Sequence, residues 1–284
     1  MQRIIYGLSY ISRTMNNGMD ENLTSNQKIV KEKRERWKRE ILVYRDRINR
    51  IKNWSPIEDS TLLDDLPNIP LNYEPSPQGL AAVRISTYVL NNTFAAHEAS
   101  KAFVILWRLG QFTTISLPVR QIYELWGSSH YVGQLLSEID SSKDIEKINR
   151  KLNRLLLGAR SEVDLPWGGL SEEKSINVMD FIRSLTDTFP EAEKTYDFLC
   201  ESCHPSFLKL VYMAQAGPLR SNWENEPFNN NGHKLLNNTL MAIETAQKGL
   251  AQDTKTTLEA ILKYIRKEAP IKENLSRFEN VDLN

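Results

Sequence analysis

Pro118-Val-Arg-Gln-Ile-Tyr-Glu-Leu-Trp126 is a helical stretch in which two opposite charges stand among apolar and aromatic residues. Arg120 and Glu124 are four residues apart, so their side chains share one helical face. The apolar residues around them turn at least part of this helix inward. An Arg and a Glu that face inward cost several kcal/mol unless they are paired. The stretch therefore predicts a buried helix whose charged pair meets partners on another helix.

Those partners are offered by the segment Tyr196-Asp-Phe-Leu-Cys-Glu-Ser-Cys-His-Pro-Ser206. Its polar side chains fall on two adjoining helical faces, with Tyr196, Cys200 and His204 on one and Asp197 and Glu201 on the other. We expect Arg120 to pair with Glu201 or Asp197. We expect Glu124 to pair with His204, which completes a polar network between the two helices.

The rest of the chain also has the pattern of helices. Apolar residues at helical spacing predict helices over about 78–111, 116–139, 145–158, 190–204 and 233–268. They also predict a helix that carries Val178, Ile182 and Leu185. Ser76-Pro77 is a typical helix start, and Ser171 is a candidate cap for the helix that carries Val178. There is no alternating run of strand length and no internal repeat. The sequence predicts an all-α fold, a multi-helix bundle.

Residues 28–52 form a long basic helix ahead of this bundle. Eleven Lys or Arg and four Asp or Glu give the segment a net charge of +7, whereas the whole chain has a formal net charge of 0. Its apolar residues repeat at intervals of seven, four and three, as in a coiled-coil seam: Val30, Trp37, Ile41, Tyr44, Ile48 and Ile51. One interpretation is a helix laid against the protein's own body with its other faces solvated; the other is contact with an anionic partner.

An exposed basic helix face suits RNA or an acidic protein as partner. The side chains predicted for that contact are Lys33, Arg34, Arg36, Lys38, Arg39, Arg45 and Arg47. The heptad spacing also predicts a homo-oligomer, most simply a dimer.

Prolines mark the main boundary in the chain. We assign residues 1–54 to an N-terminal arm, 55–79 to a Pro-rich linker, 80–268 to the helical-bundle domain and 269–284 to a polar tail. The arm carries the basic helix, and the linker is the expected hinge between arm and body.

Composition argues against a membrane, a secreted or a disulfide-rich protein. The longest uncharged apolar run, about Ala102 to Trp107, is far too short to cross a membrane. The first eleven residues lack the long apolar region and the small-residue cleavage site of a secretory signal. Two cysteines are too few for a disulfide scaffold. We therefore expect a cytoplasmic protein without membrane contact.

Cys200-x-x-Cys203-His204 matches the attachment motif of c-type haem, but that attachment requires export, for which no signal is present. A zinc site built on these residues needs a fourth ligand, and none stands at a diagnostic spacing. We predict no haem, no metal and no other cofactor, with the two cysteines acting as small core residues.

Several of these motifs together resemble a bacterial all-helical family distantly grouped with HEPN domains, the higher-eukaryote and prokaryote nucleotide-binding bundle. The motifs are Arg120 with Glu124, Gly158-Ala159-Arg160, Asn177-Val178 with Ile182, and Tyr196-Asp197-x-Leu199-x-Glu201-x-x-His204-Pro205-Ser206. They cover roughly residues 80 to 265. The resemblance implies a HEPN-like bundle whose polar network includes Tyr196, Asp197 and Arg160. It also implies a role in a bacterial antiviral defence or toxin–antitoxin-type system, through binding of a protein partner or RNA.

Three other roles remain open for the same residues. HEPN ribonucleases use an Arg and a His four to six residues apart, a pair that this sequence lacks. A composite metal-independent ribonuclease site is an alternative, with His204 as general acid or base, Arg120 as phosphate clamp, and Glu124 and Glu201 as orienting groups. A second alternative is that the network is buried and only fixes the register of the helices. A third is that the chain is a structural subunit of a larger complex.

Overall fold

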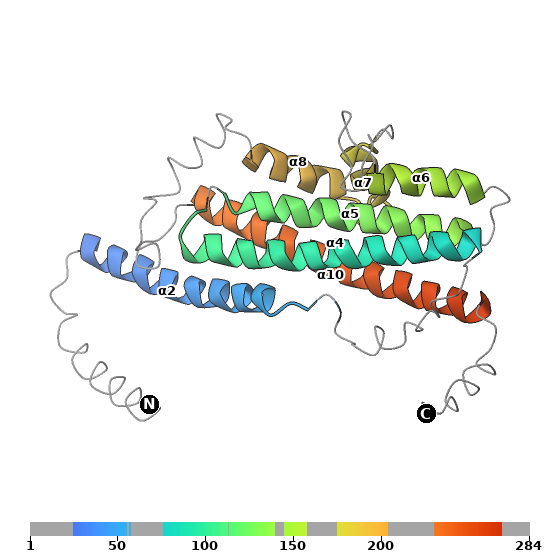
Figure 1. Cartoon of the computed structure of the whole chain (residues 1–284). Coiled ribbons are helices and arrows are strands. Elements are labelled where there is room, and N and C mark those ends of the chain that lie inside the picture. Colours follow the sequence, from blue (N-terminus) through green and yellow to red (C-terminus); the bar gives the residue numbers. More distant parts are fainter. Residues whose placement is uncertain are drawn as a thin grey trace, which may run out of the picture.

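The computed structural model describes residues 25–55, 57, 76–112, 114–139, 145–157, 175–203 and 230–268. Within these ranges the chain forms seven helices and no strand, arranged as an elongated bundle (Figure 1). The prediction of an all-α multi-helix bundle is confirmed. The predicted site residues His204 and Arg160, most of the linker and the whole tail lie outside the described residues.

Three long helices form the centre of the bundle. They are α4 (Pro77–Arg108), α5 (Ser116–Ile139) and α10 (Asn230–Glu268), and each packs against the other two. Their bounds lie close to those predicted. Ser76 caps α4 as expected, because its hydroxyl accepts a hydrogen bond from the Gly79 amide at 3.0 Å and satisfies one of the free donors of the first turn.

The turn after α4 depends on a glycine. Gly110 has a φ of 67°, in the left-handed region that a residue with a Cβ rarely adopts. The Gly110 amide donates to the Trp107 carbonyl and the Gln111 amide to the Leu106 carbonyl, both at 2.9 Å. This is the Schellman pattern of a helix C-terminus. The short turn sends α5 back antiparallel along α4 (Figure 1).

α5 lies in the middle of the fold, where it contacts α4, α6, α7, α8 and α10. Its first half is the stretch from Pro118 to Trp126. Val119, Ile122 and Tyr123 are fully buried there, and Trp126 is 4% exposed. The prediction that this helix faces inward is confirmed.

Three shorter helices cover α5 on its outer side (Figure 1): α6 (Ile145–Leu157), α7 (Val178–Ser184) and α8 (Ala192–Cys203). The cap predicted for the helix carrying Val178 was wrong. Residues 175–177 are not helical, and the Asn177 side chain, rather than Ser171, accepts from the Met179 amide at 3.0 Å. A closer Asn with extended backbone geometry satisfies the first turn and fixes the start of the helix.

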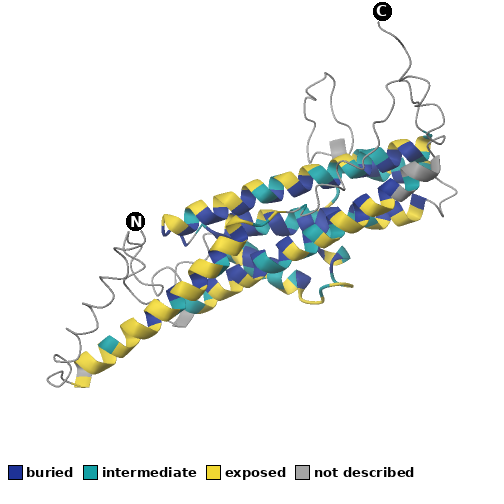
Figure 2. Cartoon of the chain, turned by 90° about the horizontal axis from the view of Figure 1, so that it is seen from below, coloured by how far each residue is buried: buried dark blue, intermediate teal, exposed yellow. Residues whose placement is uncertain are grey.

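The basic helix, α2 (Ser25–Lys52), lies along α4 and α10 with its apolar seam inward. The seam residues from Trp37 to Ile51 are between 1% and 5% exposed. Val30 is 50% exposed, because the first turns of α2 project beyond the bundle (Figure 2). The interpretation of a helix laid against the body is therefore confirmed. The heptad spacing serves packing within the chain, so the predicted dimer has to rest on other surfaces.

Polar contacts hold α2 against α10. The Arg47 guanidinium donates to both carboxylate oxygens of Glu244, at 2.9 Å from Nε and 2.8 Å from Nη2. His233 lies between the Tyr44 hydroxyl, 3.1 Å from Nδ1, and the Glu40 carboxylate, 3.4 Å from Nε2. A two-bond Arg–carboxylate pair fixes both distance and angle, so these contacts set the register of α2 on the body.

Buried hydrogen bonds also join the three central helices. Thr93 of α4 and Thr254 of α10 share a hydrogen bond of 3.0 Å, and the Asn92 amide donates to Ser128 and Ser129 of α5. Such groups are costly to bury without partners, so a shift of one helix along another would leave them unsatisfied.

α5 and α10 approach closely where the Trp126 ring covers Gly249. A Cβ at Gly249 would overlap three atoms of that ring. In an open helix, Ala is about 0.5–1 kcal/mol more favourable than Gly. Here we expect Gly249→Ala to lower the free energy of unfolding by about 1–3 kcal/mol, since the ring has to move. Urea denaturation measures it, with Gln252→Ala on the exposed side of α10 as control. An unchanged or higher stability for Gly249→Ala would contradict this packing.

The docking of α2 makes a second prediction. Arg47 and Glu244 have side chains only 14% and 27% exposed, whereas Arg36 is 77% exposed in its pair with Glu40. We expect Arg47→Ala to cost about 1–3 kcal/mol of unfolding free energy, because Glu244 loses a largely buried partner. The matched change Arg36→Ala is expected to cost at most about 0.5 kcal/mol. Equal losses in urea denaturation would show that Arg47 does not anchor the arm.

Candidate functional site

The predicted polar network exists in part, between α5 and α8. Arg120 Nε donates to Glu124 Oε1 at 2.8 Å, and the Tyr196 hydroxyl donates to the same oxygen at 2.6 Å. The Arg120 guanidinium lies over the Tyr196 ring, 5.5 Å from its centroid. These residues thus join the two helices, with the Tyr196 hydroxyl bound to Glu124. The predicted pair of Glu124 with His204 stays a prediction, because His204 lies outside the described residues. Asp197 and Glu201 of α8 are exposed.

The surroundings of this network set the protonation of its members. Burial raises the pKa of the Tyr196 phenol, and its hydrogen bond to Glu124 raises it further. Burial alone would lower the pKa of Arg120, but the ion pair with Glu124 outweighs it and raises that pKa. Burial raises the pKa of the Cys200 thiol, an effect that Arg120 partly offsets. Tyr196 therefore stays a donor, Arg120 a cation and Cys200 a thiol, an arrangement that holds the helices together without an activated nucleophile.

A pH titration tests the role of Tyr196. A phenol whose pKa is raised on folding contributes stability below its unfolded pKa of about 10 and loses that contribution as the pH rises above it. We expect Tyr196→Phe to reduce the fall of unfolding free energy between about pH 9 and 11, by at most about 1.4 kcal/mol per pH unit. Urea denaturation across this range measures both slopes. Identical slopes would mean that the phenol is not held protonated.

The side chains predicted to bind an anionic partner lie along α2, and most of them are solvent-exposed. The exposed members are Lys33, Arg34, Arg36, Lys38, Arg39 and Arg45. Arg47 is the exception, because it is bound to Glu244. The exposed part of the set is thus placed where a partner could reach it, and Arg47 serves the docking of the helix.

Five basic residues of α2, here called the basic stripe, follow one line along the helix: Lys31, Arg34, Lys38, Arg45 and Lys52. Spacings of three, four, seven and seven residues keep them within about 60° of one another around an α-helix. The acidic residues Glu32, Glu35 and Asp46 lie outside this sector by the same geometry, and Glu35 borders it with an ion pair to Lys38. Glu40 turns toward His233 of the body. The stripe thus contains no acidic residue and runs beside the buried seam.

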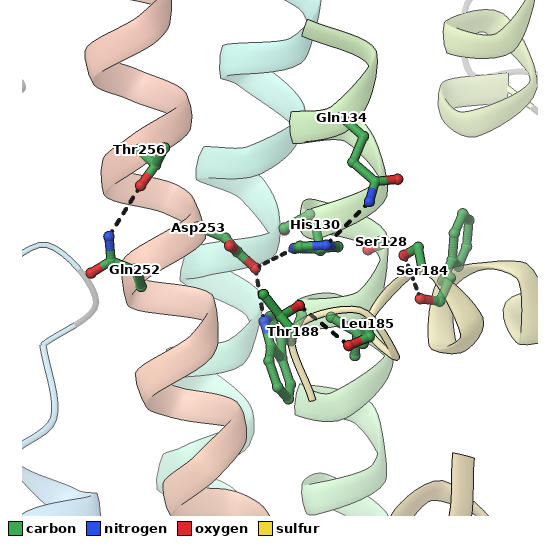
Figure 3. A network of polar contacts seen from close by, with 12 residues as sticks. Ser128, His130, Gln134, Ser184, Leu185, Thr188, Gln252, Asp253 and Thr256 are labelled. Carbon is green, nitrogen blue, oxygen red and sulfur yellow. Dashed lines mark hydrogen bonds and ion pairs between the residues drawn. The ribbon is translucent and has the colours of Figure 1, made fainter. Parts of the chain in front are cut away.

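A second cluster, which the sequence analysis did not single out, lies between α5 and α10 (Figure 3). His130 Nδ1 is 3.0 Å from Asp253 Oδ2, and the Trp126 indole donates to the same carboxylate oxygen at 2.8 Å. On the other side of the ring, Gln134 Nε2 is 3.3 Å from His130 Nε2. An imidazole whose Nδ1–H donates to a carboxylate has Nε2 free to accept, and Gln134 occupies that position as donor.

This cluster forms one end of a groove of about 780 Å³. Asp253 and His130 line that end, with the Thr256 and Thr257 hydroxyls nearby, and Leu136 and Tyr264 line the rest. His130 is 14% exposed and Asp253 23%, so both are held in place yet reach the groove. Their position in a cavity of ligand size makes this a candidate small-molecule site.

Part of the signal for this groove was present in the sequence. Trp126, His130 and Gln134 recur every four residues, which puts three hydrogen-bonding side chains on one stripe of α5. Asp253 stands between Leu250 and Thr257 on the inward face of α10, where a carboxylate needs a partner. Neither pattern tells which helix faces which, so the pairing could be found only in the fold.

Comparisons with protein-family models, with curated proteins and with solved structures found no match to this chain. In the described part of the chain, no helix has both the length and the apolar character needed to span a membrane. Among the same residues, no three His, Cys, Asp or Glu side chains come together as metal ligands. The function therefore has to be argued from the surfaces and the groove of the molecule itself.

Proposed function

We propose that this protein binds RNA through the basic stripe of α2, with the helical bundle as the platform that holds α2 in place. The observation that carries the proposal is the division of α2 into a buried apolar seam and an exposed positive line. A helix that only packed against the body would need the seam and no particular order in its charges. The stripe adds a continuous electrostatic surface at a fixed position.

The dimensions of the stripe favour a long polyanion. Lys31 and Lys52 are twenty-one residues apart, about 30 Å along an α-helix. Arg34, Lys38, Arg45 and Lys52 are exposed along this length. Lys38 has an ion pair with Glu35 at 2.7 Å, but both side chains are more than half exposed, so the pair is weak and can be exchanged for a phosphate. Such a line suits successive phosphates of an RNA strand better than the compact acidic patch of a globular protein.

The resemblance to HEPN domains supports the same proposal, because it points to a nucleic-acid context. On that resemblance we place the protein in a bacterial defence or toxin–antitoxin-type system. The ribonuclease alternative finds less support, since Arg120 and Glu124 bind each other and Tyr196.

Fluorescence anisotropy with labelled single-stranded RNA at several salt concentrations tests the stripe. The variant replaces Arg34, Lys38, Arg45 and Lys52 by Gln. A matched control removes the same charges from exposed positions elsewhere, as Arg108, Arg150, Lys234 and Lys255 to Gln. We expect the stripe variant to bind RNA more weakly and to lower the slope of log affinity against log salt by up to about three, from about 0.7 for each lost phosphate contact. The control variant should keep most of the affinity.

Equal losses of RNA affinity in the two variants would show that binding depends on the net charge of the protein and not on the stripe. Absence of RNA binding by the unmodified protein would overturn the proposal and turn the search to an acidic protein partner. Cleavage of the RNA during the titration would favour the metal-independent ribonuclease predicted from Arg120 and His204.

A further inference from the structure

The groove between α5 and α10 is separate from the basic stripe and has a different chemistry. No Lys or Arg is among its lining residues, in the part of the chain that the structure describes. Its charged group is the carboxylate of Asp253. The two groups that bind this carboxylate at 2.8 Å and 3.0 Å are the Trp126 indole and the His130 imidazole.

The hydrogen bonds indicate that His130 is neutral. Gln134 Nε2 faces His130 Nε2, and an amide N–H and an imidazolium N–H cannot bond to each other because both are donors. With Nδ1–H donated to Asp253, the neutral ring accepts from the Gln134 amide at Nε2. The Asp253 charge is thus met by neutral donors and by no cation of the lining. Such an end of the groove attracts a cation and repels a phosphate or a carboxylate.

The other end of the groove is apolar. Leu136 of α5 is buried, and Ala260 and the Tyr264 ring of α10 follow Asp253 by seven and eleven residues. At the rise of an α-helix these residues lie about 10 to 16 Å from Asp253. The groove therefore changes from anionic and acceptor-rich to apolar over the length of a small molecule.

We propose that this groove binds a small amphipathic primary amine. The ammonium group donates to Asp253 Oδ1, because the hydrogen bonds from Trp126 and His130 both go to Oδ2. The Thr256 and Thr257 hydroxyls line the same groove as further acceptors. An aliphatic or aryl tail lies against Leu136, Ala260 and the Tyr264 ring. An ammonium has three donors and no acceptor, which matches an end built from acceptors.

Two probes of equal length and opposite charge test the proposal: 4-phenylbutylamine and 5-phenylpentanoate. Isothermal titration calorimetry measures binding, and the indole N–H signal of Trp126 in an NMR titration reports whether the bond to Asp253 is disturbed. We expect the amine to bind and to shift this signal, and the carboxylate to do neither. Assignment of the signal follows from its loss in Trp126→Phe.

Two variants of α10 locate the binding. Asp253→Asn removes the charge from the groove with little change of shape, and we expect it to weaken amine binding about tenfold or more. Glu259→Gln removes the same charge from an exposed position on the same helix, outside the groove lining, and should leave binding unchanged. Ser137→Trp at the exposed rim should block entry without touching the buried hydrogen bonds, which covers the case that Asp253→Asn fails to fold.

Equal amine affinity in Asp253→Asn and Glu259→Gln would overturn the proposal, as would equal affinity in Ser137→Trp and the unmodified protein. Stronger binding of the carboxylate probe, or no heat and no indole shift up to the solubility of the amine, would overturn it as well. None of these outcomes depends on RNA binding, because the stripe of α2 and the groove share no residue.

Discussion

The contact between Trp126 and Gly249 is the constraint on which the rest of the bundle depends. It lets α5 and α10 approach closely enough for an indole ring to fill the space where a side chain would stand. The same indole donates to Asp253, so packing and hydrogen bonding fix the two helices at one level. With α5 and α10 fixed in this way, the buried hydrogen bonds of Asn92 to α5 and of Thr93 to α10 can form, since their partners meet only in one register.

The basic helix shows how one segment can serve the fold and a surface together. Its seam is buried against α4 and α10, and Arg47 and His233 fix its position by directed polar contacts. Five of its basic residues form the stripe along the edge of that seam. A flexible basic tail could carry the same net charge, but it would lose conformational entropy each time it bound a partner. A docked helix is already ordered before binding, and its fixed charge spacing favours a partner with regularly spaced charges.

Much of the fold followed from local patterns. The helices around Pro118–Trp126 and along α4 and α10 were predictable because long apolar stripes and caps such as Ser76 act within a few residues. The cap at Asn177 was missed because two polar residues competed and only the backbone decides between them. The candidate sites likewise contain features that local sequence patterns predict and features that only the tertiary structure shows. The link of Arg120 and Glu124 to the helix of Tyr196 could be inferred from charge burial, whereas the role of the Tyr196 hydroxyl as donor to Glu124 needed the geometry. The pairing of His130 with Asp253 joins residues 123 positions apart and needs the tertiary arrangement.

The sharing of Asp253 between Trp126 and His130 ties the interior of the bundle to its groove. A smaller ring at position 126 would ease the contact with Gly249, but it would also release one of the two donors that hold the carboxylate. A substitution at Trp126, His130, Gly249 or Asp253 therefore alters the contacts of the other three. We expect substitutions at these positions to occur together rather than singly among descendants of this sequence. The carboxylate end of the groove is therefore constrained by the packing of the core as well as by any ligand.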